Sequence, residues 1–193
     1  LKSCISLPSF FNLYKKTLTF LFIIAKNDDK LKEEEKERIS DMDRIQFLEK
    51  PQATHEEMIA ALDRACTQVE KNLPEFTYQY QSASSTDLFY QPIINKDWTN
   101  GFWTGEIWLA YEHTKKNIFK YAALIQVEDF YKRIHEEFSV DHHDLGFLYS
   151  LSCVAGWKLT GDETAKRAAI LAAEKLITRF QEKGEFIQAW GEM

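Results

Sequence analysis

The sequence has few cysteines, no excess of basic charge and no catalytic signature of the common nucleophile or phosphate-binding types. Its three cysteines, Cys4, Cys66 and Cys153, are far apart and lack metal-ligand spacing, which predicts reduced thiols in a cytoplasmic protein. A net charge of −6 argues against nucleic-acid binding, which requires a basic face. Glycine-rich phosphate loops, nucleophile elbows and cysteine–histidine signatures are also missing, and we expect no cofactor.

The chain also lacks an apolar run long enough to cross a membrane. The stretch from Thr17 to Ala25 is shorter than the roughly 20 apolar residues that a bilayer requires. Because Lys15 and Lys16 precede it, it is also compatible with an export signal, but no small-residue cleavage site follows. We therefore expect no membrane partner.

The first 41 residues differ in character from the rest of the chain. A mixed-charge run, Asn27 to Arg38, follows the apolar stretch, and the first methionine is Met42. Such a run is typical of a solvated helix or a linker, and translation from upstream of a start at Met42 would explain the arm. We predict a flexible or non-native arm at residues 1–41 and one domain at residues 42–193.

Helical periodicity dominates the predicted domain. Thr54 and Glu57 form a capping-box pattern, an apolar face follows, and Pro74 is expected to end this helix. Four more helices are predicted, and the polar segment between the first two is expected to be a long connection without strands: Trp103–His113, Asn117–Phe138, Leu145–Leu159 and Glu163–Lys183, with the connection at Gln79–Lys96. The fold class is therefore all-α, and its 45% apolar residues suffice for a packed core.

These helices and the segments between them repeat. Three aromatic-glycine segments, residues 97–103, 141–147 and 186–191, place Gly101, Gly146 and Gly191 at intervals of 45 residues. Residues 111–123 align with 157–169 at an offset of 46. Such periods are typical of stacked helical hairpins, so we expect the three segments to open on one side of the molecule.

Asp144 is the carboxylate most suited to catalysis in these segments. It follows His142 and His143 and precedes a helix start, so simple N-capping is the alternative interpretation. The amides and dipole of the helix N-terminus favour its ionised form, which suits stabilisation of positive charge. His143 is expected to bind substrate. A metal site is not expected, because adjacent histidines point in different directions and a third ligand is needed.

Aromatic and polar side chains in the same segments suit a sugar. Trp98 and Trp190 lie in loops, where their planes can stack on a pyranose ring, although packing between hairpins is the alternative for each. Asn100 is expected to bind hydroxyl groups or to cap the following helix. Trp103, Trp108 and Trp157 lie in predicted helices, and we expect them in the core.

The three segments resemble the signatures of unsaturated glucuronyl hydrolases, glycoside hydrolase family 88. Residues Trp98–Gly105 with Leu109–Glu112, then His142–Ser150, then Phe186–Gly191 are similar to three ordered motifs of that family. The resemblance covers about residues 54–193 and implies helical hairpins of an (α/α)6 barrel, incomplete in this chain.

The resemblance also implies a reaction and a substrate. The family hydrates the 4,5 double bond of the unsaturated uronic acid at the end of a disaccharide from hyaluronan or chondroitin, which separates that uronic acid from the next sugar. Asp144 then corresponds to the first of two essential aspartates, while His143, Trp98 and Trp190 match substrate contacts. No metal or cofactor is implied.

The resemblance places the second aspartate beyond the third motif. We therefore expect this chain to be the inactive N-terminal half of such an enzyme and to self-associate through uncovered hairpin faces that carry Met58 and Val69 at one end and Ile170 or Leu176 near the other. The rival interpretations are a non-catalytic helical-repeat module that binds sugars or protein, and a helical-ring hydrolase or lyase of another specificity.

Overall fold

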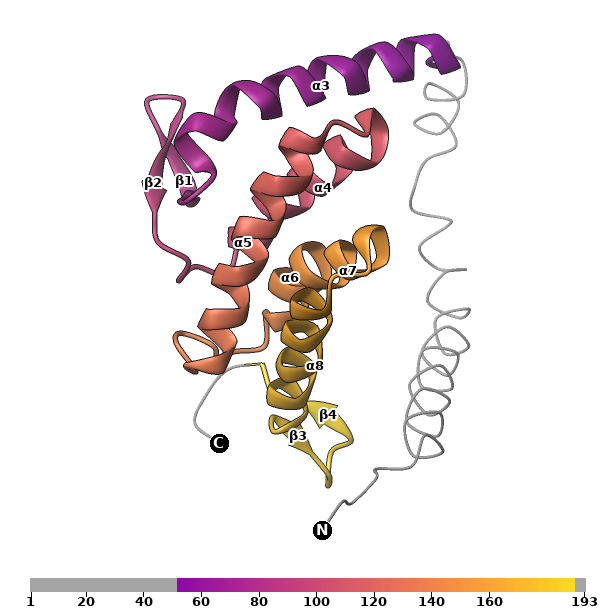
Figure 1. Ribbon diagram of the computed structural model, residues 1–193. Helices are drawn as coiled ribbons and strands as arrows, with labels where there is room; N and C mark the ends of the chain where they lie inside the picture. The colour runs from indigo at the N-terminus through magenta and orange to yellow at the C-terminus, as the bar shows by residue number, and fades with distance from the viewer. Residues whose placement is uncertain (1–51, 190–193) are drawn as a thin grey trace, which may run out of the picture. The chain divides into compact units, whose positions relative to one another are not determined.

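The computed structural model describes residues 52–189, and those from His55 onward form one compact unit (Figure 1). The predicted arm at residues 1–41, its boundary with the domain, and Trp190 lie outside the described residues. The helices are α3 (His55–Phe76), α4 (Asn100–Thr114), α5 (Asn117–His135), α6 (Leu145–Tyr149), a π-helical turn η1 (Ser150–Val154), α7 (Ala155–Thr160) and α8 (Glu163–Ile177). All five predicted helices are confirmed; the fourth is the continuous run α6–η1–α7.

Helix α3 extends beyond the predicted stop. Pro74 lies inside it, and the helix ends only at Phe76. Proline removes one amide donor but lies here in the last turn, where the hydrogen-bond ladder is about to end. Only the second half of the helix is buried, through Cys66, Val69, Leu73 and Phe76, so Val69 is not part of an uncovered face. Met58 remains 54% exposed.

The predicted connection at Gln79–Lys96 contains a β-hairpin, so the expectation of no strands was wrong. Strands β1 (Tyr80–Thr86) and β2 (Phe89–Ile93) pair antiparallel. Their two-residue turn has positive φ angles, 51° at Asp87 and 67° at Leu88, as the right-handed twist of a tight hairpin favours. Most residues of β1 are polar and only the first, Tyr80, is buried, so no apolar alternation marks the strand in the sequence.

Helices α5 and α8 are shorter than predicted. Helix α5 ends at His135 instead of Phe138, and α8 ends at Ile177 instead of Lys183. After α8, strand β3 (Phe180–Gln181) pairs with strand β4 (Phe186–Ile187). Backbone groups that helical periodicity assigned to α8 therefore form a short second hairpin.

The repeat in the sequence is a repeat in space. Helices α4 and α5 form one hairpin, and α6–η1–α7 with α8 forms the next; α4 packs against the α6–η1–α7 run, and α5 packs against α8 (Figure 1). Both hairpin turns close identically: Lys115 and Gly161, 46 residues apart, are left-handed and donate 2.8 Å bonds to the carbonyls of Tyr111 and Trp157. The left-handed residue is a common way to end a helix.

Large aromatic side chains fill the space between the hairpins. Trp103 and Trp108 are buried as predicted, and their indole N–H groups donate to the carbonyls of Phe76 at 2.8 Å and Ser152 at 2.7 Å. The acceptor Ser152 lies in the π-helical turn. Trp157 was wrongly expected in the core: it is 40% exposed, with the Lys166 ammonium 5.6 Å from its ring centroid.

Two further findings concern the described residues. Cys66 and Cys153 are buried free thiols, as predicted, and Cys4 lies outside the described range. Among the helices of residues 52–189, none has both the length and the apolar character needed to cross a membrane.

Candidate functional site

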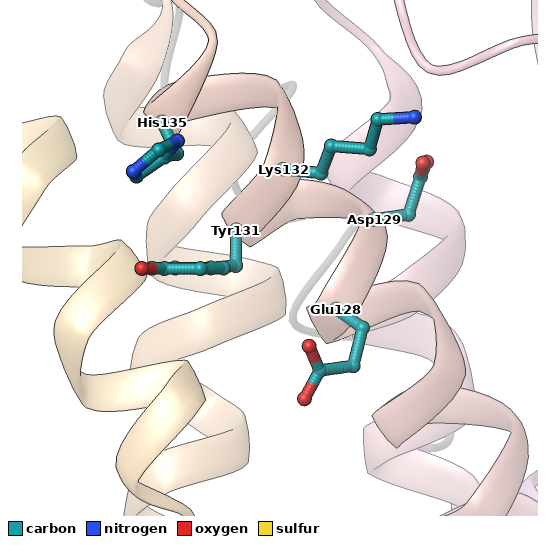
Figure 2. Close-up of a pocket in the computed structure, with 5 residues that line it drawn as sticks. All are labelled: Glu128, Asp129, Tyr131, Lys132 and His135. Carbon is teal, nitrogen blue, oxygen red and sulfur yellow. The ribbon is translucent and has the colours of Figure 1, made fainter.

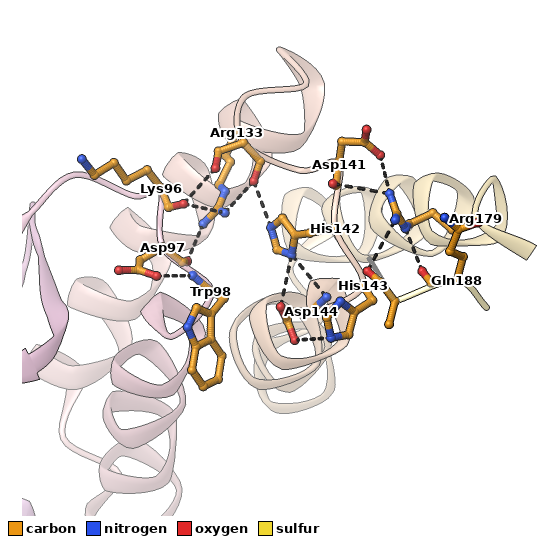
Figure 3. Close-up of polar contacts among 12 residues, drawn as sticks. Lys96, Asp97, Trp98, Arg133, Asp141, His142, His143, Asp144, Arg179 and Gln188 are labelled. Atoms are coloured by element: carbon orange, nitrogen blue, oxygen red, sulfur yellow. Dashed lines mark hydrogen bonds and ion pairs between the residues drawn. The ribbon is translucent and has the colours of Figure 1, made fainter. Parts of the chain in front are cut away.

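Three loops meet at one end of the helical hairpins. We name them the first rim loop (residues 95–99, before α4), the second rim loop (residues 136–144, between α5 and α6) and the third rim loop (residues 178–189, after α8). Figure 3 shows Trp98 of the first loop across from Asp144 of the second, with Arg179 and Gln188 of the third next to Asp141 on the other side of the second loop. The predicted gathering of the three aromatic-glycine segments at one mouth is confirmed for the described residues.

Asp144 holds the N-cap position of α6 without capping it. Its carbonyl accepts the Phe147 N–H at 2.9 Å, but its side chain makes no capping bond and its φ and ψ are −79° and 9°. Capping side chains need an extended backbone that aims them back at the helix amides. The carboxylate instead lies 3.3 Å from Nε2 of His143 and 3.6 Å from Nδ1 of His142, and it is 19% exposed. Simple N-capping therefore does not describe this side chain.

The hydrogen bonds of His142 fix its tautomer. Its Nδ1 accepts the backbone N–H of Asp144 at 3.2 Å, so Nε2 carries the proton and donates it to the carbonyl of Ser139 at 3.1 Å. Burial, the main cause, lowers the pKa of His142 below its ordinary value near 6.5. The ring is therefore neutral at pH 7, and His142 acts as a strut between two backbone groups of the second rim loop.

An exposed aromatic cluster flanks the carboxylate. The Trp98 ring contacts Phe102 and Phe147 edge-on, with centroids 6.4 and 6.2 Å away, and the two phenyl rings stack at 5.9 Å. All three remain exposed; Trp98 is 47% exposed. Trp98 thus packs between hairpins and still presents an open face, which suits stacking on a sugar ring.

Asn100 is buried and serves the loop itself. Its Oδ1 accepts the backbone N–H of Asp97 at 2.8 Å, and its Nδ2 donates to the carbonyl of Gln81 at 3.3 Å. With 1% of its surface exposed, the amide holds the first rim loop against β1. This geometry supports a structural role in place of the predicted substrate contact.

Two buried arginines tie the three rim loops together. The Arg133 guanidinium donates to the first loop, at Asn95 Oδ1 (2.8 Å) and at the carbonyls of Asp97 (3.1 Å) and Lys96 (3.3 Å), and to the second loop at the Ser139 carbonyl (2.8 Å). It is 2% exposed, and burial lowers its pKa, yet arginine remains charged at neutral pH.

Arg179 makes the equivalent link one repeat later. It donates to Asp141 Oδ1 of the second loop at 2.8 Å and to the carbonyls of Gln188 (2.9 Å) and Ala189 (3.4 Å) in the third. The loops that carry Trp98 and Asp144, and the one that leads toward Trp190, are thus joined in series.

Other features of the described residues do not enlarge this site. A hollow of about 460 Å³ on α5 is lined by Glu128, Asp129, Tyr131, Lys132 and His135 (Figure 2), and it contains none of the predicted site residues. Within residues 52–189, no group of three His, Cys, Asp or Glu side chains is placed to hold a metal ion.

Comparison with known proteins identifies relatives of a single kind. No protein-family model matches the sequence. The chain is 48% identical over 147 residues to the unsaturated chondroitin disaccharide hydrolase of Streptococcus pneumoniae, covering 76% of this chain and 37% of that protein. It is 40% identical over 121 residues to the unsaturated glucuronyl hydrolase of Bacillus sp., covering 63% of this chain and 32% of that protein. The chain is related to the unsaturated glucuronyl hydrolases.

Solved structures of unsaturated glucuronyl hydrolases share the fold of the part of this chain that they match. The crystal structure of the Streptococcus agalactiae enzyme superposes with a TM-score of 0.69 at 41% identity, over 76% of this chain and 37% of that one. The described hairpins are thus of the α/α-barrel type, as predicted. This chain spans about a third of the length of the relatives it matches.

The residues that sequence reasoning missed are those that support the site. Phe102 and Phe147 extend the exposed aromatic face, while Arg133 and Arg179 fix the loops. The two arginines lie 46 residues apart, the offset of the repeat, so extending the alignment of residues 111–123 with 157–169 by ten positions would have paired them. The roles of Asp144, His143 and Trp98 remain predictions, and Trp190 lies outside the described residues.

Proposed function

We propose that this chain forms one side of the active site of an enzyme that hydrates the 4,5 double bond of a terminal unsaturated uronic acid. One observation carries the proposal: the Asp144 carboxylate does not cap its helix and lies against His143 at a rim that also presents Trp98. A carboxylate beside imidazole nitrogens suits proton transfer and charge stabilisation. An exposed indole beside it suits the apolar face of a sugar ring.

The relatives suggest the substrate. A variant of the S. agalactiae enzyme is known in complex with dGlcA-GalNAc6S; it superposes on this chain with a TM-score of 0.67 at 40% identity. We take the substrate to be an unsaturated disaccharide of this kind, bound with its uronic acid ring at the rim.

In the proposed reaction an acid protonates C4 of the double bond and water adds at C5. The resulting hemiketal opens and releases the next sugar. Positive charge that develops at C5 during protonation would be stabilised by an ionised Asp144. His143, 3.3 Å from that carboxylate, would orient it and contact the substrate, and Trp98 would stack on a sugar ring.

A chimera tests the proposal. Residues 52–193 would replace the matching region of the S. pneumoniae relative, and turnover would be followed as loss of the ultraviolet absorbance of the double bond. We expect the chimera to hydrate the disaccharide and its Asp144→Asn variant to lose this activity by about 10²-fold or more. The amide is nearly isosteric and retains the backbone bonds of Asp144, so the melting temperature should change little.

Three controls sharpen the result. Asp162→Asn alters an aspartate that does cap its helix, α8, through a 2.7 Å bond from Ala165, and should leave turnover intact. The 193-residue chain alone is expected to show no turnover, because the resemblance places the second carboxylate beyond the third motif. Near-normal turnover in the Asp144→Asn chimera would reduce Asp144 to a structural role, and disaccharide binding without turnover by the unaltered chimera would favour a non-catalytic module.

A further inference from the structure

Arg133 is a buried cation whose partners are mostly backbone carbonyls. Its two terminal nitrogens donate to acceptors on both the first and second rim loops, and within residues 52–189 it forms no ion pair with a carboxylate. Burying an unpaired cation is costly unless hydrogen bonds replace its hydration. The planar fork of arginine can reach acceptors on two sides at once, which the single ammonium of lysine cannot.

The contacts of Arg133 lead directly to the candidate catalytic carboxylate. The Ser139 carbonyl accepts both the Arg133 guanidinium and Nε2–H of His142, and Nδ1 of His142 accepts the backbone N–H of Asp144. On the other side, Arg133 donates to the carbonyl of Asp97, whose side chain accepts the backbone N–H of Trp98 at 2.8 Å. Figure 3 shows this continuous path of polar contacts between Trp98 and Asp144.

The repeat supplies independent support for this arrangement. Asn95 and Asp141 are 46 residues apart, as are Arg133 and Arg179. Each side-chain oxygen accepts from the corresponding arginine at 2.8 Å. A buried arginine that links the loop before a hairpin with the loop after it is therefore a device used twice, on both sides of Asp144.

We propose that Arg133 is a positioning residue, which sets the orientation of His142 and thereby the placement of Asp144 relative to Trp98 across the first and second rim loops. This proposal rests on the proposed function for its catalytic meaning. Its geometric part, the dependence of the orientation of His142 on Arg133, can be measured without any substrate.

The experiment uses the 193-residue chain labelled with ¹⁵N in its histidine rings. In the unaltered chain, the nitrogen shifts of His142 should report a protonated Nε2 and an unprotonated Nδ1. Arg133→Lys keeps the charge but loses the fork that ties the Ser139 carbonyl to the first rim loop. The carbonyl that accepts Nε2–H of His142 is then no longer held in place, so the two nitrogens of His142 should move toward the average of a mixed tautomer. Arg167→Lys is the matched control, because Arg167 lies on α8 over the Tyr131 ring and should leave His142 unchanged.

Two outcomes would overturn the positioning role. The first is a folded Arg133→Lys chain in which His142 keeps its original shifts, since a merely structural arginine would not affect the tautomer. If that variant does not fold, the unaltered chain still decides: Arg133 guanidinium protons should exchange slowly and show Overhauser contacts to both loops. Rapid exchange and contacts to one loop alone would also contradict the proposal.

A binding measurement separates the inference from the proposed function. Tryptophan fluorescence of the folded chains would be titrated with the unsaturated disaccharide, and Arg133→Lys should weaken binding by about tenfold while Arg167→Lys does not. If the unaltered chain fails to bind, the tautomer result still decides the role of Arg133, and the chimera decides the proposed function. Equal affinity of both variants for the disaccharide would show that Arg133 does not influence the binding site.

Discussion

Gly101 lies against the backbone of Phe147, so closely that a β-carbon at position 101 would be 2.4 Å from the Phe147 carbonyl oxygen and 2.6 Å from that of Leu148. The first turn of α4 and the start of the α6–η1–α7 run therefore touch through backbone atoms. Gly146, the corresponding glycine of the next segment, has nothing within 4 Å of such a carbon. Although the two glycines are equivalent in the repeat, only Gly101 is required for close contact between helices.

This difference predicts opposite effects for the same substitution. Gly101→Ala should destabilise the chain by about 1–3 kcal/mol, because the contacted backbone cannot move aside as a flexible side chain would. Gly146→Ala lies in the helix with open space around it and should be neutral or stabilise the chain by up to about 1 kcal/mol. Urea unfolding of both variants checks this; equal stabilities would show that the two helices do not approach so closely.

Periodicity determined most of the fold from sequence alone, because each helix buries one face against a neighbouring hairpin. The starts at Asn117, Leu145 and Glu163 were placed correctly, although only the last is capped by a side chain, that of Asp162. Strand β1 was missed because its side chains are largely exposed and polar, and the end of α8 was missed because pairing with β4 competes with local helical preference. Such choices depend on tertiary contacts.

The sequence was enough to predict where the site lies, but not which residues hold its loops in place. Repeat phase brought Trp98 and Asp144 to one rim, but whether Asp144 caps its helix depends on one pair of backbone angles. Asn100 was expected to bind hydroxyl groups or to cap the following helix, yet the fold buries it against Gln81. Arg133 carried no local signal, because its function depends on acceptors 36 to 38 residues earlier in the chain.

The lowered pKa of His142 predicts a dependence of stability on pH. The unfolded chain binds a proton at His142 near pH 6.5, whereas the folded chain, where burial lowers the pKa, binds it only at lower pH. The contribution of neutral His142 to the free energy of unfolding is therefore complete above about pH 6.5, and it is lost as the pH falls through the pKa of the folded state.

Denaturant unfolding at pH 7.5, 6.5 and 5.5 tests this for the unaltered chain and His142→Asn. The asparagine oxygen can still accept the Asp144 N–H but does not titrate, so the variant should lose less stability between pH 6.5 and 5.5. Parallel curves for the two chains would show that His142 does not titrate differently on folding.

Trp98 should report sugar binding by fluorescence. Of the four tryptophans in the described range, Trp103 and Trp108 are buried, whereas Trp98 and Trp157 are 47% and 40% exposed. The unsaturated disaccharide should change the emission of the unaltered chain. Trp98→Phe should reduce that change, leaving the part that comes from Trp190, and should weaken binding by about tenfold, as loss of a stacking contact implies. Trp157→Phe is the control, because Trp157 lies beside Lys166 and away from the rim loops; a change that survives Trp98→Phe and disappears with Trp157→Phe would contradict the site.

Self-association of the 193-residue chain is predicted from the apolar side chains that its hairpins leave uncovered. Met58 near the start of α3 is 54% exposed and Ile170 on α8 is 46% exposed, and in stacked hairpins each such face ordinarily packs against a neighbour. Large exposed apolar patches favour association in water. Light scattering of the purified chain should therefore give a mass above the 22.6 kDa of one chain. The double variant Met58→Lys and Ile170→Lys should shift the mass toward that of the monomer, while Lys158→Glu, on exposed helix surface, should not. A monomeric mass of the unaltered chain at every concentration would mean that these faces do not cause self-association.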